Sequence, residues 1–190
     1  MKIWIVGSQG TGKYSIARML EKSKMKVGKI FTNSSPQEIK YHKDLYKFYG
    51  SEDIRDIFEN NAYVFMTDIQ CSMIEGLDLN EYENNDVFVL TIEQFLNINT
   101  KYVTRDDLIV WLDGNWNWRK HNLEEDDEKC LRELAERSCY TDFNTLILNL
   151  ENSLKNILYF YNEDPERVKT IVKIIYNNPK LKSEFTKNFS

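Results

Sequence analysis

The chain has 190 residues, of which 42% are hydrophobic, and its formal net charge is −5 at pH 7. This length and apolar content suit one compact domain over residues 1–190, and the excess of carboxylates argues against general nucleic-acid binding. No apolar run reaches membrane length and no signal peptide precedes the first predicted strand, so we expect a cytoplasmic protein without membrane association.

The first predicted elements are a strand, a glycine-rich loop and a helix. Residues 2–7 are apolar at nearly every position, as in a strand buried on both faces, and residues 13–22 carry apolar side chains at helical spacing. The loop between them matches G-x-x-x-x-G-K-[ST] except at its last position. Such a loop turns backbone N–H groups and a helix N-terminus toward a polyphosphate, whereas the alternative is a glycine-rich turn with a structural role. The predicted nucleotide-binding residues are Gly7, Ser8, Gln9, Gly10, Thr11, Gly12, Lys13, Tyr14 and Ser15.

Tyr14 stands where this motif has the small hydroxyl residue that ligates Mg²⁺. A phenol is too long for that position, so we expect Tyr14 to pack outward or to stack. Ser15 is a poor substitute because it lies about 100° further round the helix. Lys13 can still reach the β and γ phosphates as a point charge. The loop therefore predicts ATP binding, but it lacks the hydroxyl side chain that would ligate Mg²⁺.

The rest of the chain alternates between predicted strands and helices. Apolar runs predict strands over 25–32, 86–92, 107–113 and 145–149. Spacing and capping predict helices from Ser51, from about Glu93, and over 123–139, 151–162 and 164–177. Residues 61–74 fit either a strand, by propensity, or a helix, by spacing. Strands separated by helices after a phosphate loop predict an α/β fold, a three-layer sandwich in which helices cover both faces of a parallel sheet.

The order of these parts resembles a guanylate kinase-like nucleoside monophosphate kinase, of the small divergent kind common in bacteriophages. The resemblance covers residues 2 to about 160, and the phosphate loop is its one specific motif. It implies ATP and Mg²⁺ as cofactors, a nucleotide substrate and, for a phage protein, the host cytoplasm. Residues 32–60 correspond to the family's acceptor-binding insertion. The implied contacts are Asn149, at the end of a short strand, for the nucleotide, and Ser34, Tyr41, Tyr49 and Ser51 for the acceptor.

The resemblance also implies a lid over 114–130 that brings cations to the phosphates. Arg119 matches that position, and Arg137 on the helix behind it can supply a second arginine. Such charges neutralise the phosphoryl group in transfer, so the predicted catalytic residues are Lys13, Arg119 and Arg137. The alternative for both arginines is a solvated helix charge paired with a neighbouring acid. The family's arginine after its paired threonines is missing, because this chain reads Phe-Thr-Asn-Ser over 31–34.

A carboxylate near the end of a strand beside the loop is expected to hold hydrated Mg²⁺. Asp113 is the first candidate because it ends an apolar run. The resemblance, however, implies that its strand is not a neighbour of the loop strand, and Glu93 then becomes the better candidate. For each of them the alternative is a cap or loop carboxylate.

Three functions are compatible with these residues. The first is ATP-dependent phosphoryl transfer to a nucleoside monophosphate. The second is a catalytically degenerate nucleotide-binding or protein-interaction module, supported by Tyr14 and by the missing arginine. The third is a deoxynucleoside kinase, suggested by the acid at Glu93 after an apolar strand. We favour a kinase, with a protein partner expected if the site is degenerate.

Overall fold

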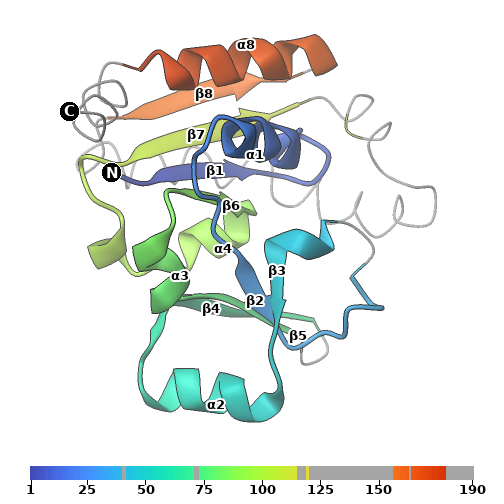
Figure 1. The fold of residues 1–190 in the computed structure, drawn as a ribbon, viewed down its shortest axis with the longest axis vertical. Coiled ribbons are helices and arrows are strands. Elements are labelled where there is room, and N and C mark those ends of the chain that lie inside the picture. The colour runs from blue at the N-terminus through green and yellow to red at the C-terminus, as the bar shows by residue number, and fades with distance from the viewer. Residues whose placement is uncertain (40–41, 71–72, 115–118, 120–155, 163, 179–190) are drawn as a thin grey trace.

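The computed structural model describes residues 1–39, 42–70, 73–114, 119, 156–162 and 164–178. Its central sheet has four parallel strands in the order β6-β1-β7-β8 (Figure 1). Strand β1 carries the phosphate loop at its carboxyl end and lies between β6 and β7. The bounds of the strands are β1 (Ile3–Gly7), β6 (Val87–Leu90), β7 (Leu108–Asp113) and β8 (Ile157–Tyr161).

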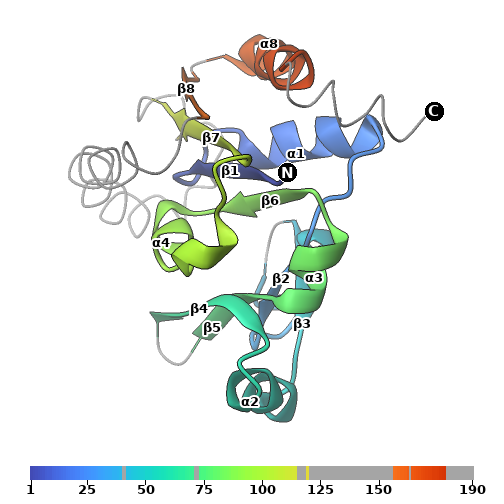
Figure 2. The same cartoon turned by 90° about the vertical axis from the view of Figure 1, so that its left-hand side faces the viewer.

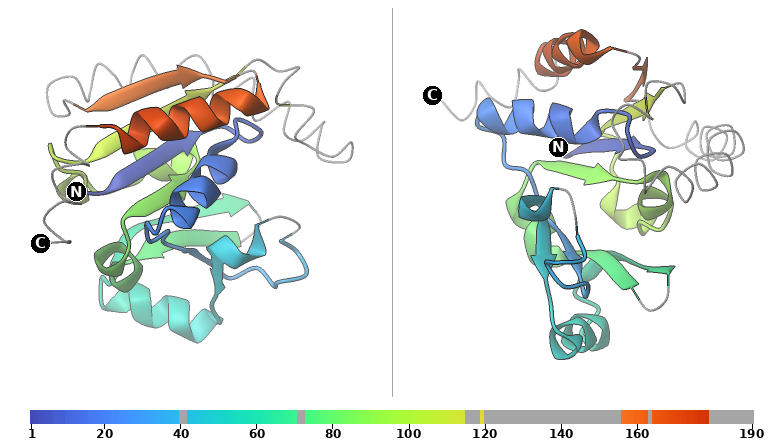
Figure 3. Two further views of the ribbon diagram at one scale, coloured as in Figure 1. Left: turned by 45° about the horizontal axis from the view of Figure 1, so that its top comes forward. Right: turned by 90° about the vertical axis from the view of Figure 1, so that its right-hand side faces the viewer.

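Both faces of this sheet are covered, which explains the continuous apolar run of β1. Ile3 and Ile5 pack on one face with helices α1 (Lys13–Lys22) and α8 (Pro165–Tyr176). These two helices lie side by side over the sheet (Figure 3). Trp4 and Val6 point to the opposite face and pack with helix α4 (Ile92–Leu96) and the second sheet. The alternation follows from the two-residue period of a strand.

A second, mixed sheet of four strands lies below the first, in the order β3-β2-β5-β4 (Figure 2). In it β2 and β3 are parallel, whereas β5 runs antiparallel to both β2 and β4. Helix α2 lies at the far end of this sheet, and α3 leads back to β6. The bounds are β2 (Ile30–Thr32), η1 (Lys43–Leu45), β3 (Tyr46–Phe48), α2 (Ser51–Glu59), β4 (Tyr63–Gln70), β5 (Met73–Asp78), α3 (Leu79–Asn84) and η2 (Thr100–Tyr102).

The predicted α/β class, with a parallel sheet covered by helices on both faces, is confirmed. The second sheet was not predicted as a sheet, although its hairpin settles the ambiguous segment 61–74 in favour of a strand. Within the part of the chain that the structure describes, no helix is both long and apolar enough to cross a membrane. The predicted helix at 123–139 and strand at 145–149 lie outside the described residues.

Two predicted elements are wrong in their type or extent. The helix expected over 151–162 is strand β8 from residue 157 onward, because aromatic residues with high strand propensity pair there in parallel with β7. The strand expected over 25–32 is confined to 30–32. Before it, Val27 makes a single bridge to Val87, and Gly28 passes so close to Phe88 that an added Cβ would lie 2.4 Å from its ring.

Candidate nucleotide-binding site

The phosphate loop connects the carboxyl end of β1 to the first turn of α1. Gly10 and Gly12 have φ angles of 76° and 88°, a left-handed conformation that side chains with a Cβ rarely adopt. The Thr11 hydroxyl donates to the Ser8 carbonyl at 2.8 Å and closes the loop. The loop therefore has its glycines where the backbone requires them, and helix α1 begins at Lys13 with its N-terminus facing the loop.

Lys13 is buried and bends back onto the loop. Its ammonium donates to the Ser8 carbonyl at 3.1 Å and lies 5.0 Å from the centre of the Tyr14 ring. Burial and, to a smaller extent, the nearby positive charge of Arg119 lower the pKa of Lys13 to about 7, while Glu75 opposes the shift. A phosphate group at the loop would favour the charged form and offer a stronger, charge-assisted hydrogen bond than a neutral carbonyl.

Arg119 lies directly on the phosphate loop. Its side chain is buried, and Nε donates to the Gln9 carbonyl at 2.9 Å. The backbone of Arg119 packs against Gly10 so closely that an added Cβ there would lie 2.7 Å from the Arg119 carbonyl oxygen. Two cations from separate elements thus converge on one phosphate loop. Arg137 and Asn149, the other residues assigned to this role, lie outside the described residues.

Asn162, immediately after β8, supports the loop from behind and was missed in the sequence. Its side-chain NH₂ group donates to the Thr11 carbonyl at 2.9 Å, and its backbone N–H donates to the Asp113 carbonyl at 2.8 Å. The side chain is fully buried, and among the described residues its Oδ1 accepts no hydrogen bond. The signal for it was a strand of aromatic residues followed by Asn, then by the Asp164 cap and Pro165 of α8.

We predict that Asn162→Ala destabilises the fold by about 1–3 kcal/mol, because the Thr11 carbonyl loses its buried donor. The loop should also bind ATP more weakly. Urea unfolding and calorimetric titration with ATP measure the two effects. Asn60→Ala serves as the control, since the Asn60 amide donates to a backbone carbonyl on the exposed surface of α2. Equal effects of the two substitutions would contradict the supporting role of Asn162.

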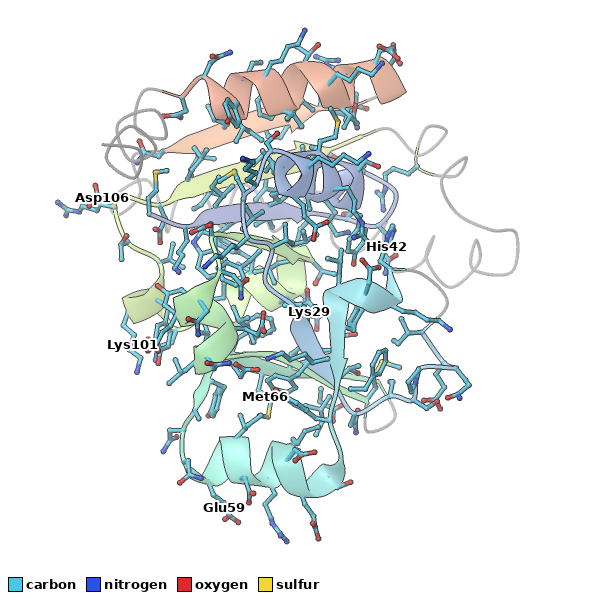
Figure 4. All side chains as sticks on the ribbon, in the orientation of Figure 1. Lys29, His42, Glu59, Met66, Lys101 and Asp106 are labelled. Atoms are coloured by element: carbon cyan, nitrogen blue, oxygen red, sulfur yellow. The ribbon has the colours of Figure 1, made fainter. Side chains whose placement is uncertain are left out.

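Tyr14, on the first turn of α1, contacts the segment before β3. Its ring stacks on His42 with a centroid separation of 4.0 Å, and burial raises the pKa of its phenol to about 12. Figure 4 shows His42 at the junction between the central sheet and the second sheet. One helical turn later, Arg18 pairs with Asp44 of η1. The residue that replaces the metal-ligating hydroxyl therefore joins the two halves of the molecule.

The two predicted Mg²⁺ ligands differ in their distance from the phosphate-loop strand along the sheet and in their exposure. Strand β7 pairs directly with β1, so the expectation that Asp113 lies away from the loop strand is wrong. However, Oδ1 of Asp113 accepts from the Gly114 N–H at 2.7 Å, and Oδ2 accepts from the Tyr159 hydroxyl at 3.1 Å. Glu93 is exposed on α4. No group of three or more His, Cys, Asp or Glu side chains that could hold a metal occurs among the described residues.

Two of the predicted acceptor residues, Ser34 and Tyr49, both lie beside Thr32, whose carbonyl accepts from the Tyr49 N–H at 2.9 Å. Ser34 is buried beside Thr32, whose hydroxyl accepts from the Ser34 N–H at 3.2 Å. The Tyr49 hydroxyl donates to Asp78 at 3.2 Å. Ser51 is exposed at the start of α2, which Figure 1 shows at the end of the molecule away from the phosphate loop. Tyr41 lies outside the described residues. Their role in acceptor binding stays a prediction.

A row of buried polar side chains on the second sheet offers an alternative. Thr32 and Thr67 lie directly opposite Glu75 on the two strands that flank it, and all three are buried. Residues opposite one another share a face of the sheet. The Glu75 carboxylate accepts from the Gln94 side chain at 2.5 Å. The sequence contained no local signal for this row, because its three members come from the separate strands β2, β4 and β5.

No protein-family model matches the chain, and no curated protein matches it. Among solved structures, the chain is similar to a guanylate kinase from Anaplasma phagocytophilum, with a TM-score of 0.54 and 14% sequence identity. The match covers 94% of this chain and 88% of that one. The fold is guanylate kinase-like. At this identity the likeness concerns the fold, and it agrees with the family that the phosphate loop and the order of elements resemble.

Within this guanylate kinase-like fold, the loop, Lys13 and Arg119 lie together at the carboxyl end of the central sheet. Ligands of open α/β sheets bind at this end of the strands. The second sheet is connected to this part of the molecule by a hydrogen bond from Gln94 of α4 to Glu75 of β5. The arrangement can hold a polyphosphate against two cations and bring a second ligand toward it from the second sheet.

Proposed function

We propose that this chain is an ATP-dependent phosphotransferase that acts on a nucleoside or nucleoside monophosphate. The observation that carries the proposal is the convergence of Lys13 and Arg119 on the carbonyls of one phosphate loop. Both side chains are buried and preorganised, so they can stabilise charge that develops on the transferred phosphoryl group without reorganising in water. The guanylate kinase-like fold and the sequence resemblance favour a nucleoside monophosphate as acceptor.

The chain's own residues account for binding and charge stabilisation. The loop amides and the N-terminus of α1 would hold the β and γ phosphates, and Lys13 would exchange the Ser8 carbonyl for a phosphate oxygen. Arg119 would likewise exchange its hydrogen bond to the Gln9 carbonyl for one to a phosphate oxygen. Because Tyr14 stacks on His42, the loop has no hydroxyl ligand for Mg²⁺ at that position, whereas the Asp113 carboxylate accepts one hydrogen bond on each oxygen and keeps lone pairs that could hold hydrated Mg²⁺. No step of the proposed transfer is assigned to a metal held there.

ATP is expected to raise the stability of the folded chain, because it binds the native state alone. At a concentration 100-fold above its Kd the gain is about 2.7 kcal/mol. Thermal unfolding with ATP, with and without Mg²⁺, measures this gain, and a coupled assay of ADP release with each common nucleoside and nucleoside monophosphate measures turnover. No shift with any nucleotide would overturn the proposal.

A degenerate nucleotide-binding module is the second candidate, favoured by the stacking of Tyr14 on His42. It predicts the same stabilisation by ATP without ADP release. The variant Tyr14→Thr, which restores the motif's hydroxyl, separates the two. Turnover that is unchanged or raised in Tyr14→Thr supports an enzyme, whereas ATP binding without turnover in either protein supports the module.

A further inference from the structure

Tyr14 departs from the phosphate-loop motif, and the proposed function assigns it no task. Its ring has two neighbours of different kinds. The Lys13 ammonium lies 5.0 Å from the ring centre, within the range at which an aromatic face attracts a cation. The His42 imidazole stacks on the ring at a centroid separation of 4.0 Å and an interplanar angle of 20°. One side chain thus lies against both the phosphate-binding cation and the segment that leads into β3.

This stack is part of a seam between α1 and residues 42–46. The side chains of Tyr14 and Tyr46 share a hydrogen bond. Arg18, one helical turn further along the same face of α1, pairs with Asp44 of η1. Elsewhere α1 packs mainly on β1, β6 and α8. Tyr14 and Arg18 therefore connect the phosphate-loop helix to η1 and β3.

An uncommon backbone conformation brings His42 to Tyr14. The φ angle of His42 is 54°, in the left-handed region that residues with a Cβ seldom adopt. His42 is the N-cap of η1, and its side chain is exposed, so hydrophobic burial does not explain the turn. Such a conformation persists where surrounding contacts favour it, and the stack on Tyr14 is a contact of this kind.

The stack joins two uncharged rings at neutral pH. Desolvation lowers the pKa of His42 below its usual range, the Arg18 guanidinium lowers it further, Asp44 opposes the shift, and Lys13 adds to it. Burial raises the pKa of the Tyr14 phenol to about 12. His42 therefore adds no third positive charge beside Lys13 and Arg18, and another neutral aromatic ring at residue 42 should preserve the contact.

Occupation of the loop acts on the same turn of α1 that carries Tyr14. In the proposed function, the Lys13 ammonium exchanges the Ser8 carbonyl for a phosphate oxygen, and Tyr14 follows Lys13 directly at the start of the helix. A polyphosphate that holds this turn in place also favours the position in which Tyr14 meets His42. Because coupling between two equilibria is reciprocal, the stack then favours polyphosphate binding by the same factor.

We propose that Tyr14 and His42 are positioning residues that couple the phosphate loop to the second sheet. ATP at the loop stabilises η1 and β3, and the stack in turn raises the affinity for ATP. This inference rests on the proposed function, because it takes ATP as the ligand of the loop. Serine or threonine at residue 14 has no ring to stack, so this chain has exchanged a metal-ligating hydroxyl for a contact between its two halves.

Hydrogen exchange of the full chain, with and without saturating ATP, tests the coupling. In the unmodified chain, ATP should slow the exchange of amides at residues 43–48 about 5-fold, although none of them belongs to the loop. Exchange in α2, which lies on the second sheet outside the seam, should not change. The added protection at 43–48 should be lost in Tyr14→Leu and in His42→Leu, and it should be kept in His42→Phe.

Calorimetric titration measures the reciprocal effect on ATP binding. We expect Kd for ATP to rise about 5-fold in Tyr14→Leu and in His42→Leu, and to be no higher in the double variant than in Tyr14→Leu, because either substitution alone removes the stack. Tyr63→Leu is the matched control. Tyr63 stacks on Phe58 with ring centroids 6.2 Å apart, beside α2 and away from the phosphate loop (Figure 1), so both measurements should be unchanged.

Several results would overturn this inference. One is protection at 43–48 that persists in either Leu variant or is absent from the unmodified chain with ATP bound. Another is a pair of effects on Kd that multiply in the double variant, since the two residues would then act independently. Circular dichroism checks folding, and if Tyr14→Leu does not fold, the exposed variant His42→Leu decides the test. Absence of ATP binding in the unmodified chain would instead contradict the proposed function itself.

Discussion

Replacing Lys13 with Met is expected to remove phosphoryl transfer while leaving the chain folded. The ammonium is the cation on the first turn of α1, and the loss of one preorganised charge-stabilising group costs about 10²- to 10³-fold in kcat. Met has a similar volume and fills the buried space without a charge. ADP release under saturating ATP measures the effect. Lys22→Met, at the exposed end of the same helix, should retain full activity.

The same substitution has a signature in the pH dependence of stability. Burial lowers the pKa of Lys13 from 10.5 to about 7, so between these values the unfolded chain binds a proton that the folded chain does not. Stability from this group therefore rises as the pH increases through that window. Urea unfolding at pH 7 and pH 9.5 should show this rise in the unmodified chain and a smaller one in Lys13→Met. Identical pH profiles would mean that the ammonium is not desolvated.

Trp4→Ala is expected to cause the largest loss of stability, about 3–5 kcal/mol. Trp4 is fully buried on the face of β1 that meets the second sheet. Its ring centre lies 5.0 Å from that of Phe88 and 6.3 Å from that of Phe95, and its N–H donates to Asp107 at 3.3 Å. Removing the indole leaves a cavity between the two sheets and removes a donor from a buried carboxylate.

Urea unfolding measures this loss, and Phe58→Ala is its control. Phe58 is also aromatic but 59% exposed on α2, so its replacement should cost less than about 1 kcal/mol. Because small domains have stabilities of about 5–15 kcal/mol, Trp4→Ala could leave part of the population unfolded at 37 °C. A loss below that of Phe58→Ala would contradict the role of Trp4 in joining the sheets.

The phosphate loop was predictable because its requirements are local. Gly10 and Gly12 are needed for left-handed backbone angles, and Lys13 follows at the start of a helix. All of this lies within one stretch of chain. Arg119 was named through a resemblance in the order of elements and not through a pattern in its own neighbourhood, and its catalytic role stays a prediction.

Strand β8 was harder to predict because so short an apolar segment fits both the two-residue period of a strand and the 3.6-residue period of a helix. Residues 157–161 pair with β7, and this pairing, with a partner more than 40 residues earlier in the chain, decides the conformation. The error had a consequence for the site. With β8 read as a helix, Asn162 had no place at the carboxyl end of the sheet, and its hydrogen bond to the Thr11 carbonyl was missed.

The sequence by itself determined the α/β class, the phosphate loop and the apolar character of the central strands, since these follow from local backbone geometry and from period-two burial. Only the tertiary structure decided which strands flank β1, that Tyr14 stacks on His42, and that Gln94 donates to Glu75 of the second sheet. Those juxtapositions depend on strand order and on packing between two sheets. Such long-range contacts leave no mark on the residues adjacent in the chain.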